Sequence, residues 1–260
     1  MEEKKTDSQG SSTVTTISKI IELLSIHGKI RPADIARELG LARANVHRLL
    51  ATLKEIGYVE SYKDGSHSLT FRFFKLANTV PYSRNLIDAV KPEMLKLAGL
   101  TGETVSNAVL YQDEVLFIDR VETSINLILG SQVGSSCPLH ATALGKTFLA
   151  FIPTEELESI LGRIKLESWT PNTIVSREDL LVELDTVREN GVAYCRQELS
   201  LDVNSIAAPV LDLNGRICLA ISVSGPADRF TLESMRKIEW DLITTTRTVS
   251  HHLHGELKGA

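Results

Sequence analysis

The sequence predicts an α/β protein of the α+β type, with an N-terminal winged helix-turn-helix, a linker helix and a C-terminal domain whose sheet is mainly antiparallel. Three helical patterns and a hairpin pattern follow one another over residues 13–71. In the rest of the chain, short apolar strands joined by tight turns outnumber the helices. The 260 residues, 43% of them hydrophobic, suffice for a core in each part. We divide the chain into a disordered polar tail (1–12), a winged helix-turn-helix (13–78), a linker helix (79–91) and a C-terminal domain (92–258).

Three helices are predicted in the N-terminal part. The first ends near Gly28, the second runs from Pro32 to the capping residue Gly40, and the third covers residues 42–56. Because only Leu41 and its neighbours separate the second helix from the third, the chain must turn sharply there, as a helix-turn-helix requires. The apolar residues that define the buried faces are Ile17, Ile20, Ile21, Leu24, Ile35, Ala36, Leu39, Val46, Leu49, Leu50 and Leu53.

A hairpin is predicted directly after the third helix. Residues 58–62 and 67–71 have the composition of strands, and the turn residues 63–66 join them. A hairpin in this position is the wing of a winged helix-turn-helix.

The third helix is predicted to carry a DNA-reading face on its opening turns, which in a recognition helix normally meet base edges. Arg can donate two hydrogen bonds to guanine, and Asn can pair with adenine. The alternative is that these polar residues are only solvated. In the wing turn, Lys63 either contacts phosphate or is solvated. The exposed residues of the opening turns are Arg43, Ala44, Asn45, His47 and Arg48.

The distribution of charge supports this assignment. The whole chain has a formal net charge of −5, which by itself argues against a protein that binds nucleic acid. Residues 13–78, however, contain ten Lys and Arg against six Asp and Glu, whereas residues 79–260 contain sixteen against twenty-four. A basic N-terminal part ahead of an acidic remainder indicates that only the first part faces phosphate.

The C-terminal part is predicted to contain a sheet with small residues on one face. Strands are expected at 104–111, 115–121, 126–130, 192–198, 205–211 and 216–224. Helices are expected at 73–80, 86–100, 142–151, 154–161, 177–190 and 232–253. Small residues on a sheet face leave room for a small polar ligand or, equally, for a closely packed helix. Those on the small face are Ser205, Ala207, Cys218, Ala220, Ser222 and Ser224, while Ile217, Leu219, Ile221 and Val223 face the other way.

Other motifs are interpreted as structural. The run Gly145-Lys146-Thr147 ends like a phosphate-binding loop, but His140 stands where the first glycine is required, so we interpret Lys146 as a helix-surface residue. No Ser or Cys stands in a nucleophile motif that His140 could serve, which favours a buried structural role and a protein that is not an enzyme. Neither a metal nor another cofactor is expected, because the C-terminal histidines lack a nearby carboxylate or thiol. These are His251, His252 and His254.

Cysteine usage and hydropathy indicate where the protein works. The cysteines, Cys137, Cys195 and Cys218, are widely spaced and odd in number, which fits reduced thiols better than disulfides. No signal-peptide pattern is present, and no window approaches the roughly 18 consecutive apolar residues of a membrane-spanning helix. We expect a cytoplasmic protein without a membrane partner.

Several of these segments resemble the IclR family of bacterial transcription regulators. The stretch ADIARELGLARANVHRLLATLKEIGYVE (33–60) is similar to the family's helix-turn-helix, including its His47-Arg48-Leu49-Leu50 run. The resemblance spans about residues 13–253 and implies a winged helix, a linker helix and a GAF-like effector domain, in a dimer or a dimer of dimers. The segments that resemble the effector domain, in the same order, are TGETV (101–105), PLHATALGKTFLA (138–150), SIAAPVLDLNG (205–215) and ISVSGP (221–226).

The resemblance also implies a function. It suggests a repressor rather than an activator, whose affinity for a palindromic operator in double-stranded DNA changes when a small organic or sugar acid binds. Backbone amides beside ATALGK and strand hydroxyls are implied to hold the carboxylate. The positions that match the family's effector contacts are Leu129, Cys137, Ala143, Leu144, Cys195, Val203, Ser205, Ser222 and Ser224.

The sequence leaves two alternatives to this function. One is an enzyme with an accessory DNA-binding domain, and the other is a structural protein that binds DNA without a ligand. Where many members carry an acidic run, this chain has Tyr194-Cys195-Arg196-Gln197-Glu198. We hypothesise that Arg196 favours an anionic effector.

Overall fold

The computed structural model describes residues 12–77, 79, 83–123 and 132–256, which belong to two compact units, Met1–Arg84 and Asn85–Ala260. The boundary between the units falls inside the range 79–91 that the sequence assigns to a linker helix. The predicted strand 126–130 lies outside the described residues, as does the predicted polar tail except for Ser12. No helix in the described ranges is both long enough and apolar enough to cross a bilayer.

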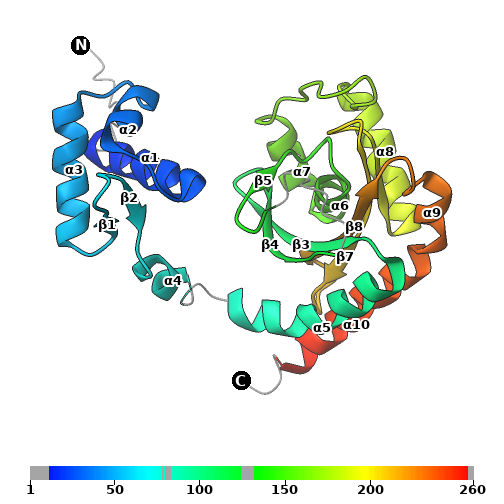
Figure 1. Cartoon of the computed structure of the whole chain (residues 1–260). Coiled ribbons are helices and arrows are strands. Elements are labelled where there is room, and N and C mark those ends of the chain that lie inside the picture. Colours follow the sequence, from blue (N-terminus) through cyan, green and yellow to red (C-terminus); the bar gives the residue numbers. More distant parts are fainter. Residues whose placement is uncertain (1–11, 78, 80–82, 124–131, 257–260) are drawn as a thin grey trace, which may run out of the picture. The chain divides into compact units, whose positions relative to one another are not determined.

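The first unit is a winged helix-turn-helix, as predicted (Figure 1). Buried residues of the three long helices and the first strand form its core, among them Ile20, Ile35, Leu50 and Val59. Its elements are α1 (Ser12–His27), α2 (Pro32–Glu38), α3 (Arg43–Glu55), β1 (Val59–Ser61), β2 (His67–Leu69) and α4 (Arg72–Ala77).

Two tight turns shape this unit. Between α2 and α3, Gly40 has a φ of +65°, a conformation that glycine adopts without strain, and the Leu41 N–H donates to the Ala36 carbonyl at 2.9 Å. In the wing, the Asp64 carboxylate accepts hydrogen bonds from the Ser66 N–H (3.0 Å) and hydroxyl (2.6 Å). These bonds hold the pKa of Asp64 below its usual value. The wing turn is therefore closed by its own side chains.

The second unit is built on a six-stranded sheet in the order β5-β4-β3-β8-β7-β6. Every pair of neighbouring strands is antiparallel, which confirms the predicted sheet type. The strands are β3 (Thr104–Tyr111), β4 (Glu114–Val121), β5 (Ser136–Cys137), β6 (Ala193–Arg196), β7 (Val203–Leu211) and β8 (Ile217–Pro226).

Helices cover both faces of this sheet (Figure 1). One core joins the sheet to α6 (Ala143–Phe151), α7 (Thr154–Leu161) and α8 (Arg177–Asn190). The other joins it to α5 (Ser83–Thr101), α9 (Leu232–Lys237) and α10 (Glu239–Glu256). Side chains alternate along β8 as predicted from Leu219 to Val223. Ala220 packs in the first core, and Leu219, Ile221 and Val223 pack in the second core.

Three details of this unit differ from the predictions. The helix predicted at 232–253 is interrupted at Ile238, between α9 and α10. Ile217 packs with the first core instead of the second, because a register shift places it opposite Leu211 and breaks the alternation at Cys218. The two-residue strand β5 was not predicted, since so short a segment has no periodicity to read.

Candidate DNA-reading helix and effector cavity

The outer face of α3 carries the predicted DNA-reading residues. Arg43, Ala44, His47 and Arg48 are exposed, and Asn45 is half-buried. The face opposite packs into the core through Val46, Leu49, Leu50 and Leu53. The Arg48 guanidinium donates to the Asn45 side-chain oxygen at 3.0 Å, which holds the two side chains together on the surface. Lys63 is exposed in the wing turn.

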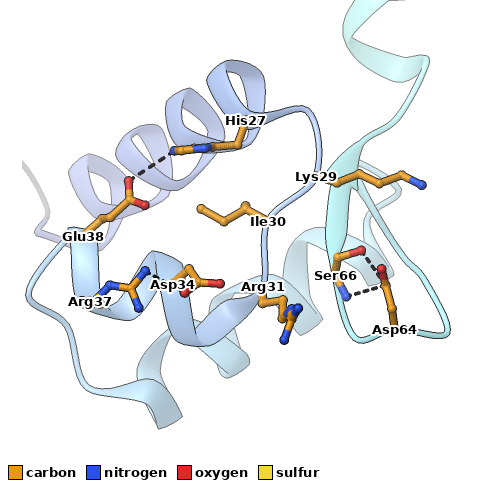
Figure 2. Close-up of a pocket in the computed structure, with 9 residues that line it drawn as sticks. All are labelled: His27, Lys29, Ile30, Arg31, Asp34, Arg37, Glu38, Asp64 and Ser66. Carbon is orange, nitrogen blue, oxygen red and sulfur yellow. Dashed lines mark hydrogen bonds and ion pairs between the residues drawn. The ribbon is translucent and has the colours of Figure 1, made fainter.

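A polar groove of about 500 Å³ lies beside the wing in the same unit (Figure 2). Two polar side-chain pairs lie along it. His27 Nε2 lies 3.3 Å from Glu38 Oε2, and Arg37 Nη2 lies 2.8 Å from Asp34 Oδ1. The groove thus has charges of both signs and one apolar lining residue, Ile30.

Two cations of this groove were missed by sequence reasoning. Lys29 and Arg31 lie three residues and one residue before Pro32, the first residue of α2, and both are exposed. Lys29 Nζ lies 3.6 Å from the centroid of the Tyr62 ring, a cation–π contact that ties it to the wing. The signal that was available is a pair of basic residues just before a predicted helix-turn-helix, whose first helix crosses the DNA backbone.

The second unit contains a cavity of about 440 Å³ at the start of α6, between the sheet and the loops around residues 169 and 199. Eight of the nine predicted effector residues line it, and the ninth, Leu129, lies outside the described residues. The sequence left open whether the small face of the sheet packs against a helix or lines a ligand site, and the structure shows both. Ala207 and Ala220 pack in the same core as α6, while the serines line the cavity. The lining residues are Phe117, Ser136, Cys137, Pro138, Thr142, Ala143, Leu144, Trp169, Cys195, Leu199, Ser200, Val203, Ser205, Ser222 and Ser224.

Serine side chains line this cavity. Ser222 is 2% exposed and Ser205 is 9% exposed as whole residues, and neither hydroxyl is among the buried, unpaired polar atoms of the described residues. Ser224, which pairs with Ser205 across β7 and β8, lines the same wall. The serines therefore give the cavity wall hydroxyl groups that can donate to or accept from a polar ligand or water.

The first turn of α6 lies at the same cavity. The Thr142 hydroxyl caps the helix by accepting from the Gly145 N–H at 3.0 Å. The N–H groups of Ala143 and Leu144, at the first two helical positions, have no acceptor within the helix. No Asp, Glu, Lys, Arg or His side chain is among the lining residues described, so this helix end supplies the positive potential of the site.

Lys146 does not lie on the helix surface, and that prediction was wrong. Its side chain is 0% exposed, and its ammonium group donates to Glu183 and Glu198, each at 2.8 Å. Its amino group is therefore held by two carboxylates and is not free to bind a phosphate. His140 has the buried structural role that was predicted, with Nε2 2.9 Å from the Glu167 carbonyl oxygen.

Comparison with known proteins assigns the chain to a family. The model of the IclR helix-turn-helix domain matches residues 16–61, and the C-terminal model of the bacterial transcriptional regulator IclR matches residues 79–251. The chain belongs to the IclR family. As an IclR-family member it is a DNA-binding transcription regulator and not an enzyme.

Individual relatives agree with this assignment. The regulator KdgR of Dickeya chrysanthemi is 31% identical over 93% of this chain and 80% of its own length. The transcriptional repressor IclR of Escherichia coli is 31% identical over 82% of this chain and 79% of its own length. The fold matches an IclR homolog from Microbacterium hydrocarbonoxydans, solved in complex with 4-hydroxybenzoate, with a TM-score of 0.82 at 22% identity over 93% and 99% of the two chains.

The thiols of this IclR-family chain are poor nucleophiles. Burial raises the pKa of the Cys137 thiol to about 12. Burial and the nearby Glu198 carboxylate raise the pKa of Cys195 as well. All three cysteines are free. Cys137 and Cys195 therefore line the cavity as neutral, weakly polar groups.

Arg196 lies away from the cavity. It is exposed, and it follows Cys195 on β6, so the two side chains point to opposite faces of the strand. The hypothesis that Arg196 attracts an anionic effector has no support in this arrangement. His251 and His252 are exposed, the His254 side chain lies outside the described residues, and the described residues contain no group of three or more His, Cys, Asp and Glu suited to a metal.

Gly145→Ala is expected to destabilise the second unit. A Cβ at this position would lie 2.2 Å from the Leu139 carbonyl oxygen, so α6 would have to move away from the preceding segment. Overpacking of this kind costs about 1–3 kcal/mol, and urea unfolding followed by circular dichroism would measure it. The control is Gly99→Ala in α5, where an added Cβ meets nothing within 4 Å. Equal stability of the two variants would contradict the prediction.

Proposed function

We propose that this chain is a repressor whose affinity for its operator changes when a small carboxylic acid binds in the cavity at the start of α6. The observation that carries the proposal is that the serines Ser205 and Ser222 line the same cavity as the first turn of α6. Helix N-termini favour carboxylates, and hydroxyls can donate to or accept from the rest of the ligand.

The cavity suggests the size and shape of the acid. Its volume of about 440 Å³ is within the range of small-molecule sites and exceeds what a two- or three-carbon acid fills. Phe117, Leu144 and Trp169 add apolar surface to the lining of the cavity. We therefore favour an acid with a ring-sized, partly apolar body. That the Microbacterium homolog was solved with 4-hydroxybenzoate supports this choice.

The DNA side of the proposal rests on α3 and its surroundings. Arg43, Ala44, Asn45, His47 and Arg48 are proposed to read bases, while Lys63, Lys29 and Arg31 are proposed to contact phosphate. In a homodimer, two such helices would enter successive major grooves, about 34 Å or a multiple apart, on a palindromic operator in double-stranded DNA. Phe71, directly before α4, is 90% exposed, and Phe74, within α4, is 68% exposed. These two rings offer an apolar surface for a second copy of the chain.

A ligand panel with one variant tests the effector site. We expect 4-hydroxybenzoate or benzoate to raise the melting temperature more than pyruvate, glyoxylate or gluconate does. Ser222→Ala should weaken binding of the active acid about tenfold, as expected for a lost hydrogen bond to a charged or polar ligand. The control is Ser106→Ala, since Ser106 is equally buried and pairs with Ser222 across the sheet but does not line the cavity.

Two outcomes would contradict the proposal. One is that no acid of the panel changes either the melting temperature or the gel shift on DNA upstream of the chain's own gene. That result would favour a protein that binds DNA constitutively. The other is that the two serine variants bind the active acid equally well.

A further inference from the structure

The C-terminal end of α3 has a hydrogen-bonded cap. The cap does not use the carbonyl groups of residues 56–58, which can therefore accept hydrogen bonds from other segments. The Gly57 N–H donates to the Lys54 carbonyl at 3.0 Å, and the Tyr58 N–H donates to the Leu53 carbonyl at 2.8 Å. Gly57 has a φ of +79°. This is the geometry of a Schellman motif, in which the chain turns away from the helix axis. The carbonyls of residues 56, 57 and 58 then point outward.

All three of these carbonyls are bonded by the segment that begins α4. The Arg72 guanidinium donates to the Ile56 carbonyl at 2.5 Å. The Thr70 hydroxyl donates to the Gly57 carbonyl at 2.6 Å, and the Thr70 N–H donates to the Tyr58 carbonyl at 3.0 Å. The positive charge of Arg72 is also favourable at the C-terminal end of a helix dipole.

Ring contacts add to these bonds. Arg72 lies over the Tyr58 ring with Cζ 4.6 Å from its centroid, and the rings of Tyr58 and Phe73 meet edge to face at 5.3 Å. Thr70, Arg72 and Phe73 thus all contact residues 56–58, which directly follow α3. We call these contacts the Arg72 clamp.

The helix α4 does not contribute a buried residue to the core. None of its six residues is buried, whereas α2 and α3 both contribute to the core of the first unit. The chain that leads to the second unit leaves the first through α4. The clamp therefore connects α4, through which the chain leaves the first unit, to the C-terminal end of α3. The helix α3 is the one that carries Arg43 and Arg48.

We propose that the Arg72 clamp makes α4 a rigid extension of α3 and that Arg72 and Thr70 are positioning residues through which the ligand state of the second unit reaches the recognition helix. This proposal rests on the proposed function. With the clamp intact, a change in the direction of α4 moves α3. With the clamp broken, α4 moves alone and the recognition helix keeps its position.

The test compares operator affinity with and without ligand in the full-length chain. The probe is the acid of the panel that changes operator affinity most in the wild-type chain. Arg72→Met should reduce that change from the 5- to 150-fold typical of allosteric coupling to about twofold or less. Operator affinity without the acid and the affinity for the acid should stay within about threefold. The control is Lys75→Met, which removes one exposed charge from the same helix and should leave the coupling unchanged.

Thr70→Val and hydrogen exchange make the test independent of a single variant. Thr70→Val removes the bond to the Gly57 carbonyl and the acceptor of the Arg72 N–H (3.3 Å). It keeps the side-chain shape and the Arg72 bond to Ile56, so it should cause a smaller loss of coupling. Amides of residues 70–77 should exchange faster in Arg72→Met than in Lys75→Met. Full coupling or unchanged exchange in Arg72→Met would overturn the proposal. So would operator binding weakened equally with and without the acid, since Arg72 would then be a DNA contact or a folding residue.

These results separate the clamp from the proposed function. If no acid alters operator binding by the wild-type chain, the proposed function fails and the signalling role of the clamp fails with it. If the wild-type chain responds and Arg72→Met responds equally, the clamp proposal alone is wrong.

Discussion

Replacing Arg48 by alanine is expected to weaken operator binding about 5- to 150-fold, the equivalent of about 1–3 kcal/mol for a lost bidentate contact to a base. Arg48 is exposed on the outer face of α3, and its guanidinium donates to the Asn45 side chain on the same helix, so its removal should not unfold the helix. A gel shift on the upstream DNA would measure the affinity, and circular dichroism would check the fold.

The control for this prediction is Arg236→Ala. Arg236 is an exposed arginine of α9, in the second unit, so the variant removes the same charge without touching the first unit. Operator affinity of the wild-type chain should fall steeply with salt, because phosphate contacts release counterions. The prediction is contradicted if Arg48→Ala binds the operator as tightly as the wild-type chain and if the affinity of the wild-type chain does not change with salt. Those results would show that α3 does not read DNA in this protein.

Local patterns explain why the first unit could be predicted closely. The helix-turn-helix depends on apolar residues spaced for one helix face and on Gly40, which adopts the positive φ of the turn before α3 without strain. The cavity wall was predictable for a similar reason. Side chains alternate along β8, so the burial of Ile221 and Val223 on one side requires Ser222 and Ser224 to face the other.

The features that were not predicted depend on residues far apart in sequence. The Arg72 clamp joins Arg72 to Ile56, sixteen residues earlier. The break in alternation at Cys218 arises from a register shift against β7, which no pattern within β8 records. Lys146 was misplaced because its helix is buried on all sides, from Ala143 to Ala150, so no polar face marks its surroundings.

Lys146→Met is expected to lower the free energy of unfolding by about 3–5 kcal/mol, the cost of leaving a buried charge without its partner. Lys146 is 0% exposed and bonds to Glu183 and Glu198, which are 37 and 52 residues away in the sequence. Glu183 is 21% exposed and can be hydrated when the ammonium group is removed, but Glu198 is 4% exposed and cannot. Most of the loss should therefore come from Glu198. Urea unfolding of the full chain would measure it.

The double variant Lys146→Met with Glu198→Gln separates the charge from the packing. Replacing both charges removes the unpaired carboxylate, and buried ion pairs are often no more stable than neutral groups of similar volume, so more than half of the lost stability should return. The control is Lys165→Met, which removes an exposed lysine and should change stability by no more than about 0.5 kcal/mol. If Lys146→Met alone were as stable as this control, water would have to reach Glu198, and the space around α6 would be more open than its packing against the sheet indicates.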